Sequence, residues 1–241
     1  MAHSPQQGST VRNHLLAALS PEILSPLLSK FSSVELPLRQ VLHAAEAPIE
    51  AVYFPETGMV SLVAGLEEGG QGEVGVVGRE GMVGLPLVMG VENAFVEAMV
   101  QLPGTALRMA TGAFRRELDG NAPLKALLLR YNEAVHAQVS QTAACNGRHA
   151  LEPRLARWLL MAHDRFDGDE LPLTQEFLAL MLCVHRPSVS VAAGILQRAG
   201  LLRYANGLII VLDRAGLEAA SCECYRVVQR RFANLLGHPT D

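Results

Sequence analysis

Residues 173–212 read LTQEFLALMLCVHRPSVSVAAGILQRAGLLRYANGLIIVL, and this stretch decides the fold. Apolar side chains recur there at helical spacing twice, before and after a short break at residues 183–185. Gly200 then stands where the end of a helix favours a residue with positive φ. Two apolar runs flank Asn206-Gly207, the strongest two-residue signal for a β-hairpin. Helix, turn, helix and hairpin in this order predict a winged helix-turn-helix, which places its second helix in the major groove of DNA.

The start of the second predicted helix carries polar side chains suited to DNA contact. Residues at this end reach base edges in the motif, and the fork of Arg186 suits a guanine. The residues that we predict to bind DNA are Thr174, His185, Arg186, Pro187, Ser188, Ser190 and Arg203. Two amphipathic helices joined by a turn also occur in proteins that never bind nucleic acid. The alternative is therefore a ligand-binding signalling module that docks to protein rather than DNA.

Composition limits the class of protein. The 241 residues include 49% hydrophobic and 18% charged side chains, which is typical of a globular chain. The net charge of −4 argues against a protein that coats polyanions. The first dozen residues are polar and no long uninterrupted apolar run follows, so we expect a cytoplasmic protein without a membrane span. We do not expect an enzyme, because the common nucleophile, phosphate-loop and metalloprotease motifs are missing.

Changes in local composition along the sequence divide the chain into four parts. We expect a flexible N-terminus over residues 1–12, followed by a sensory domain over 13–120. Most of that domain consists of short Val-, Leu- and Phe-rich segments separated by turn residues, which predicts an antiparallel, jelly-roll-like β-roll. A long dimerisation helix over 121–148 and a winged helix-turn-helix DNA-binding domain over 149–241 follow. The predicted fold class is therefore α+β.

Side chains in the long helix are spaced as in a two-stranded coiled coil. Their intervals alternate between four and three residues, which keeps one seam facing a partner helix. The predicted dimer seam consists of Leu124, Leu128, Tyr131, Val135, Gln138 and Thr142. The polar positions Gln138 and Thr142 fix the register or leave room for a bound effector. A helix packed on its own domain is the alternative, because three heptads do not exclude it.

The order of β-roll, long helix and winged helix-turn-helix resembles the Crp–Fnr family of bacterial transcription regulators, from about Asn13 to Tyr225. The resemblance is most specific at LEPRLARWLLMAHDRF, residues 151–166, and in the stretch quoted first. It implies a homodimer that binds palindromic promoter DNA and contacts RNA polymerase. It also implies that Arg186 stands where the family places an arginine on a guanine, whereas Pro187 replaces a glutamate that accepts from cytosine.

The resemblance to the family's cyclic-nucleotide pocket is partial. Members that bind cyclic nucleotides have a Gly-Glu loop for the ribose and an arginine for the phosphate. No arginine lies between Arg79 and Arg108, so a phosphate would lack its charge-assisted partner and we do not expect cyclic AMP. The residues that we assign to an effector of unknown identity are Glu80, Gly81, Gln138 and Thr142.

A Cys-Glu-Cys pair at residues 222–224 suggests a second alternative, a thiol- or metal-responsive regulator. Cys183, in the turn between the two helices, is a candidate neighbour for this pair. Two ligands without partners make a poor zinc site, so we expect an incidental thiol pair and no metal. No cysteine precedes Cys145, so the N-terminal cysteines of the iron–sulfur branch are missing and we expect no cofactor.

Overall fold

The computed structural model describes residues 11–67, 69–205 and 207–237. Most of the predicted flexible N-terminus, residues 1–10, lies outside this part. Arg12, the last residue of the predicted N-terminus, is described, and its Nη2 lies 2.8 Å from Asp167 Oδ2. Two short helices follow, α1 (His14–Ala17) and α2 (Pro21–Leu28). The side chain of Asn13 accepts a hydrogen bond from Leu16 N at 3.2 Å and so caps α1.

Antiparallel strands in two sheets form the β-roll. One sheet has the strand order β1-β7-β3 and the other β2-β6-β4-β5. The strands are β1 (Ser32–Leu36), β2 (Val41–His43), β3 (Ala51–Pro55), β4 (Met59–Gly65), β5 (Gln71–Val77), β6 (Glu97–Leu102) and β7 (Gly104–Ala110), with the 3-10 helix η1 (Leu85–Met89) before β6. Alternate side chains point inward, so Leu36 and Ala106 of one sheet meet Val60 and Val100 of the other in a buried cluster.

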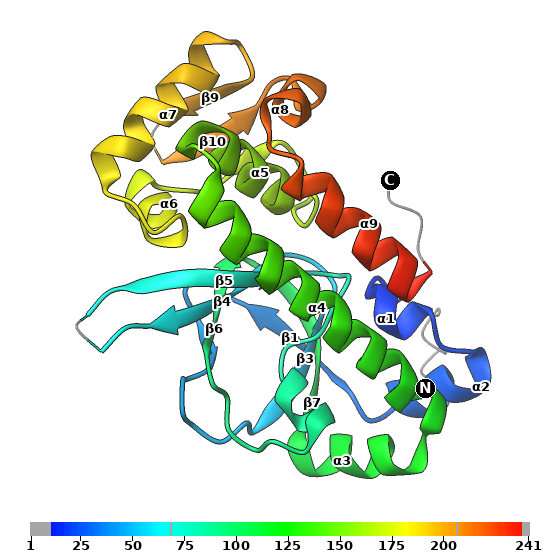
Figure 1. The fold of residues 1–241 in the computed structure, drawn as a ribbon. Helices are drawn as coiled ribbons and strands as arrows, with labels where there is room; N and C mark the ends of the chain where they lie inside the picture. Colours follow the sequence, from blue (N-terminus) through cyan, green and yellow to red (C-terminus); the bar gives the residue numbers. More distant parts are fainter. Residues whose placement is uncertain (1–10, 68, 206, 238–241) are drawn as a thin grey trace, which may run out of the picture.

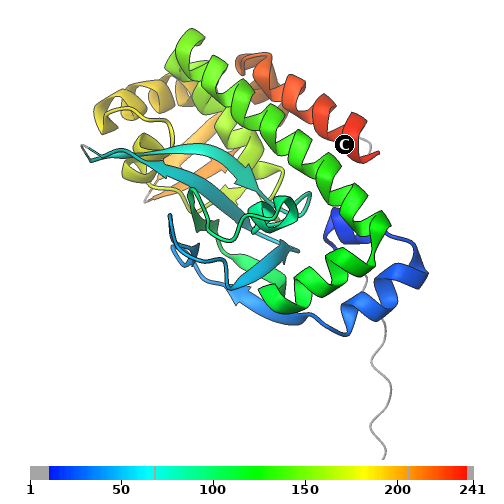
Figure 2. The ribbon, with the colours of Figure 1, turned by 60° about the horizontal axis from the view of Figure 1, so that its bottom comes forward.

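A long helix, α4 (Ala122–Arg148), crosses the molecule (Figure 1). The helix α3 (Thr111–Gly120) precedes it, and the side chain of Asn121 caps α4 by accepting from Leu124 N at 3.0 Å. The last helix, α9 (Cys224–Leu236), lies beside α4 in both views (Figures 1 and 2). The rings of Tyr131 and Phe232 meet edge to face at 6.4 Å between these helices. The roll and α9 therefore cover different sides of the long helix.

The predicted dimer seam faces the inside of the same chain. Leu124, Leu128, Tyr131 and Gln138 are buried, whereas Val135 and Thr142 are partly covered. The apolar members pack with the roll and with α9 in one core. A side chain that its own chain already covers cannot also face a second copy unless this core opens. The structure of this single chain thus favours the alternative of a helix packed on its own domain, and the seam itself stays a prediction.

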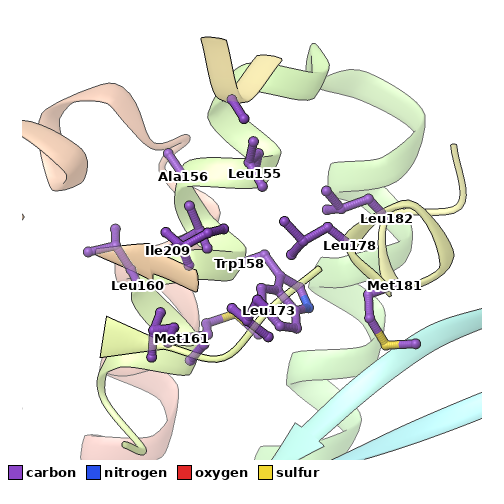
Figure 3. Close-up of a cluster of buried hydrophobic side chains, with 14 of the residues drawn as sticks. Leu155, Ala156, Trp158, Leu160, Met161, Leu173, Leu178, Met181, Leu182 and Ile209 are labelled. Carbon is purple, nitrogen blue, oxygen red and sulfur yellow. The ribbon is translucent and has the colours of Figure 1, made fainter. Parts of the chain in front are cut away.

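The head, residues 149–220, follows the long helix. Its elements are α5 (Leu151–His163), β8 (Glu170–Leu171), α6 (Gln175–Met181), α7 (Arg186–Arg198), β9 (Leu202–Ala205), β10 (Leu208–Val211) and α8 (Arg214–Ala220). Strands β9 and β10 form the predicted hairpin, with Ala205 opposite Leu208, although Asn206 lies outside the described residues. Figure 3 shows the apolar core of the head, in which Trp158 of α5 lies near Leu178 of α6. The predicted α+β fold, with a β-roll, a long central helix and a winged helix-turn-helix, is confirmed.

Candidate nucleic-acid interface

Helices α6 and α7 form the helix-turn-helix. The hydroxyl of Thr174 accepts from Phe177 N at 3.2 Å and caps α6, and the chain bends by 105° before α7. In the turn, Cys183 has a φ of 53°, a left-handed conformation that glycine adopts most easily. No single helix of the described chain has both the length and the apolar character of a membrane span. The bent pair α6 and α7 has them only when taken together.

One side of α7 is buried and the other is exposed. Val189, Ala192 and Leu196 pack into the core of the head. The exposed residues at the N-terminal end, which we call the α7 face, are His185, Arg186, Pro187, Ser188, Ser190 and Val191. The side chain of Val191 was not predicted, yet 63% of this residue is exposed. An exposed apolar side chain at this end suits the methyl group of thymine.

Two side chains of the α7 face are held by the first turn of α6. Arg186 Nε lies 3.0 Å from Glu176 Oε1, and the two side chains are 62% and 61% exposed. Ser190 Oγ donates to Gln175 Oε1 at 2.5 Å. Because both contacts are open to solvent, they are weak and a nucleic acid can displace them. Arg186 must therefore leave Glu176 in order to contact a base.

The wing places a further predicted residue on the same head. Arg203 is exposed on β9, and the amide of its neighbour Tyr204 donates to Gln197 Oε1 on α7 at 2.8 Å. This bond fixes the wing against the second helix. The cation of Arg203 is thereby available beside α7, as a contact to a phosphate requires.

A buried polar joint locks the head onto the β-roll. We define the joint by Ser61, Glu73, Glu80, Trp158 and Arg165. Trp158 Nε1 and the Ser61 hydroxyl both donate to the carboxylate of Glu73, the former at 2.7 Å. Burial raises the pKa of Glu73 to about 7, against the effect of these two hydrogen bonds. Glu73 is therefore a desolvated carboxyl group through which the roll contacts the head.

The second half of the joint involves two residues predicted to bind an effector. Arg165 donates through Nε and Nη2 to Glu80 Oε1, at 2.9 and 2.7 Å. A Cβ atom on Gly81 would lie 2.2 Å from Tyr131 Oη, so this glycine is packed against the ring. Glu80 and Gly81 thus hold the roll against the head and the long helix, while their assignment to an effector stays a prediction.

The other two predicted effector residues also serve contacts within the chain. Gln138 Oε1 accepts from Val76 N of β5 at 2.7 Å, and Thr142 Oγ1 accepts from Arg157 Nη2 at 3.0 Å. These bonds tie α4 to the roll and to α5. Gln138 and Thr142 are therefore structural ties in this arrangement of the chain, although the buried Gln138 Nε2 has no hydrogen-bond partner among the described residues.

The β-roll encloses a cavity of about 210 Å³ against α4. Apolar side chains such as Leu62, Met82 and Val135 dominate its lining. Among the described residues, those that line it include no lysine, no arginine and none of the four predicted effector residues. Burial lowers the pKa of His43, another lining residue, so this imidazole is neutral. The cavity suits an apolar molecule and offers no cation to a phosphate.

Comparison with known proteins defines the class. Residues 153–220 match the family model described as the Crp-like helix-turn-helix domain. No curated protein matches the chain. With this domain and the exposed α7 face, the chain is a DNA-binding transcription regulator.

Solved structures extend the likeness beyond the head. FixK2 from Bradyrhizobium japonicum is 16% identical with a TM-score of 0.67, over 80% of this chain and 98% of that one. A putative transcriptional regulator of the Crp/Fnr family from Eubacterium rectale is 17% identical with a TM-score of 0.66, over 86% and 96%. The c-di-GMP-responsive regulator CLP from Xanthomonas campestris is 16% identical with a TM-score of 0.62, over 80% and 99%.

Residues 153–220 thus match a Crp-like helix-turn-helix domain, and the chain as a whole has the overall fold seen in Crp–Fnr regulators. The resemblance that the sequence indicated is confirmed. The class consists of transcription regulators, which are not enzymes.

Proposed function

We propose that the chain acts in the cytoplasm as a homodimer that binds palindromic promoter sites through α7 and contacts RNA polymerase. The α7 face carries the proposal, because the buried side of the helix leaves its polar donors exposed at the N-terminal end. This is the end that reaches base edges in helix-turn-helix proteins. The bidentate fork of Arg186 is then the main contact to a guanine, with Ser188, Ser190 and Val191 beside it.

The exposed side of α4 supplies the surface for a second copy. Leu129, Glu133, His136, Ser140 and Ala143 are all exposed or partly exposed, at alternating intervals of four and three residues. This spacing forms one stripe along a helix. The small side chains of Ser140 and Ala143 allow two such helices to approach closely. In our proposal this stripe replaces the predicted seam, and the symmetry of the dimer presents two heads roughly 34 Å apart along DNA.

The DNA contact is tested on a duplex selected by the protein from a random pool. Arg186→Ala should lose about 1–3 kcal/mol of binding free energy on the selected duplex and little on random DNA. Arg226→Ala, an exposed arginine on α9, is the matched control and should bind like the wild type. Equal losses on both duplexes would reduce Arg186 to a phosphate contact. A full-length protein with no salt-dependent DNA binding would favour the protein-docking alternative.

The dimer is tested by sedimentation. Leu129→Lys should give folded monomers, because Leu129 is 46% exposed and a charge there opposes its symmetry mate. Leu128→Lys is expected to unfold the chain instead, since this side chain is fully buried. Arg130→Ala, exposed on α4 outside the stripe, should leave the dimer intact. An intact Leu129→Lys dimer would contradict the proposed stripe.

We propose that a small apolar effector binds in the 210 Å³ cavity. Tyr131 and Val135 of α4 line it, so a bound molecule contacts the long helix directly. Such a molecule changes DNA binding only if its affinity differs between two arrangements of the heads. We expect small hydrophobic probes, but not cyclic AMP, to raise the melting temperature, and we expect Val135→Phe to abolish that rise by filling the cavity. Stabilisation by cyclic AMP alone would contradict this part of the proposal.

A further inference from the structure

Three of the chain's four cysteines converge with a histidine where α4 ends. Cys145 lies in the last turns of α4, and His149 follows the helix. Cys222 precedes α9 and Cys224 begins it. One ligand atom from each of the four residues lies within 4.8 Å of the others. The predicted neighbour of the pair, Cys183, is instead exposed in the turn before α7.

Two distances within this cluster match the edges of a tetrahedron around a metal ion, and the others are no longer than 4.8 Å. Cys145 Sγ lies 3.5 Å from Cys222 Sγ, and Cys224 Sγ lies 3.6 Å from His149 Nδ1. Bonds of about 2.3 Å to sulfur and 2.0 Å to nitrogen place tetrahedral ligands roughly 3.5–3.8 Å apart. The two sulfurs are too distant for a disulfide, which needs about 2.05 Å. We propose that these four side chains bind one zinc ion.

The surroundings orient the ligands as a metal requires. His149 Nε2 lies 3.3 Å from Glu223 Oε2, so the carboxylate stands behind the ring while Nδ1 faces the sulfurs. A carboxylate at the second nitrogen is the usual partner of a metal-bound histidine. Gln141 Nε2 also donates to Cys224 Sγ at 3.0 Å, and a thiolate ligand accepts such a bond. An incidental cluster of thiols requires neither contact.

The choice of zinc follows from the ligand set. Three soft sulfurs and one imidazole in a tetrahedron select zinc over calcium and magnesium, which prefer oxygen ligands. All three cysteines are buried, which protects the ion from solvent. Four protein ligands leave no open position, so the ion has a structural or regulatory role rather than a catalytic one.

The place of the site in the fold indicates what zinc controls. His149 stands between α4 and α5, at the entry to the head, while the cysteine pair joins α8 to α9. An ion held by both segments fixes the angle between the long helix and the head. This regulation rests on the proposed function: zinc stabilises the arrangement that presents the α7 face, so the protein binds its promoter site more tightly when zinc is present.

The test uses the reduced full-length protein with cobalt(II) as the spectroscopic probe. We expect one cobalt per chain, the strong visible absorption of tetrahedral thiolate coordination, and displacement by zinc. Cys222→Ser and His149→Ala should weaken metal affinity by about tenfold or more. A substitution at a buried cysteine can prevent folding. His149 is only half-buried, so we expect His149→Ala to fold and to provide the second test. Cys183→Ser, which removes the thiol outside the cluster, should bind like the wild type.

Several results would overturn the site. These are less than stoichiometric binding by the reduced protein, an octahedral cobalt spectrum, or unchanged affinity in His149→Ala. A Cys145–Cys222 disulfide formed under mild oxidation, in a protein that takes up no metal when reduced, would overturn it in favour of a thiol switch. DNA affinity is measured separately with and without zinc. Equal affinities would overturn the regulatory role, whereas metal binding without any DNA binding would contradict the proposed function alone.

Discussion

The α7 face and the joint differ in the solvent exposure of their charged side chains. On the α7 face, Arg186 and Glu176 meet with more than half of each side chain exposed, so water competes with their contact. In the joint, the Arg165 and Glu80 side chains are only 9% and 18% exposed. A buried charge that loses its partner is far more destabilising than an exposed one. Substitutions on the α7 face should therefore cost little stability, whereas substitutions in the joint should affect both stability and the position of the head.

The largest expected effect is at the charged half of the joint. Arg165→Met keeps an unbranched side chain but leaves Glu80 buried without its guanidinium, so we expect a loss of about 3–5 kcal/mol in unfolding free energy. Denaturant unfolding measures it. Arg198→Ala, at an exposed arginine on α7, is the control and should change stability by less than about 0.5 kcal/mol. Similar small losses in both variants would remove the distinction between the two regions.

The second prediction concerns the pH dependence of Glu73. Its pKa in the folded chain is raised to about 7, so the folded state keeps a proton that the unfolded state releases near 4.5. The stabilising contribution is present below about pH 4.5 and is lost as the pH rises to 7. It amounts to about 3 kcal/mol at 1.36 kcal/mol per pKa unit.

The free energy of unfolding should fall between pH 5 and pH 8 in the wild type, and Glu73→Gln should remove the part of this fall that Glu73 causes. The single tryptophan, Trp158, donates to Glu73 and therefore reports the same titration by its fluorescence. The wild-type emission should change with a midpoint near pH 7. The Glu73→Gln variant supplies the background from all other titrating groups, which is subtracted from the wild-type curve. A pH profile shared by both proteins would show that Glu73 stays ionised in the joint.

A smaller effect is expected where the roll touches the turn before α7. A Cβ on Gly72 would lie 2.4 Å from Cys183 Sγ, so Gly72→Ala should destabilise the chain by about 1–3 kcal/mol. Cys183→Ala removes the clashing atom and should restore most of the loss in the double variant. Additive losses would show that the roll and the turn are not in contact.

The smallest effect is expected on the α7 face. Glu176→Gln breaks an exposed ion pair, so stability should change by less than about 1 kcal/mol. Binding to the selected duplex should tighten, because the change frees Arg186 and removes a negative charge near the phosphates. Binding titrations at constant salt measure this effect. Weaker binding would mean that Glu176 positions Arg186 for its contact.

The helix-turn-helix could be predicted because its signals are local. The periodic apolar side chains before and after Cys183, and the turn at residues 206–207, lie within one stretch of sequence. Each element is specified by residues close to it, and the packing of α6 on α7 follows from the short break between them.

The role of the long helix could not be predicted from its own residues. Periodicity shows which side of α4 is buried, but the pattern at Leu124, Leu128 and Tyr131 is the same whether a second copy or α9 covers it. The joint could not be predicted for a related reason. Glu73 and Trp158 are 85 residues apart, and no local sequence pattern connects them. The metal cluster did leave a signal, because Cys145 and His149 are separated by one helical turn.

The position of the last helix has a consequence for synthesis of the protein. The ribosome makes α9 after all the other elements that the structure describes, yet α9 covers part of the apolar side of α4. Until α9 emerges, Tyr131 lacks the ring of Phe232 beside it, and the nascent chain exposes an apolar surface that favours aggregation. Chains that stall or terminate before residue 224 should therefore depend on chaperones, and a fusion partner is better placed at the N-terminus.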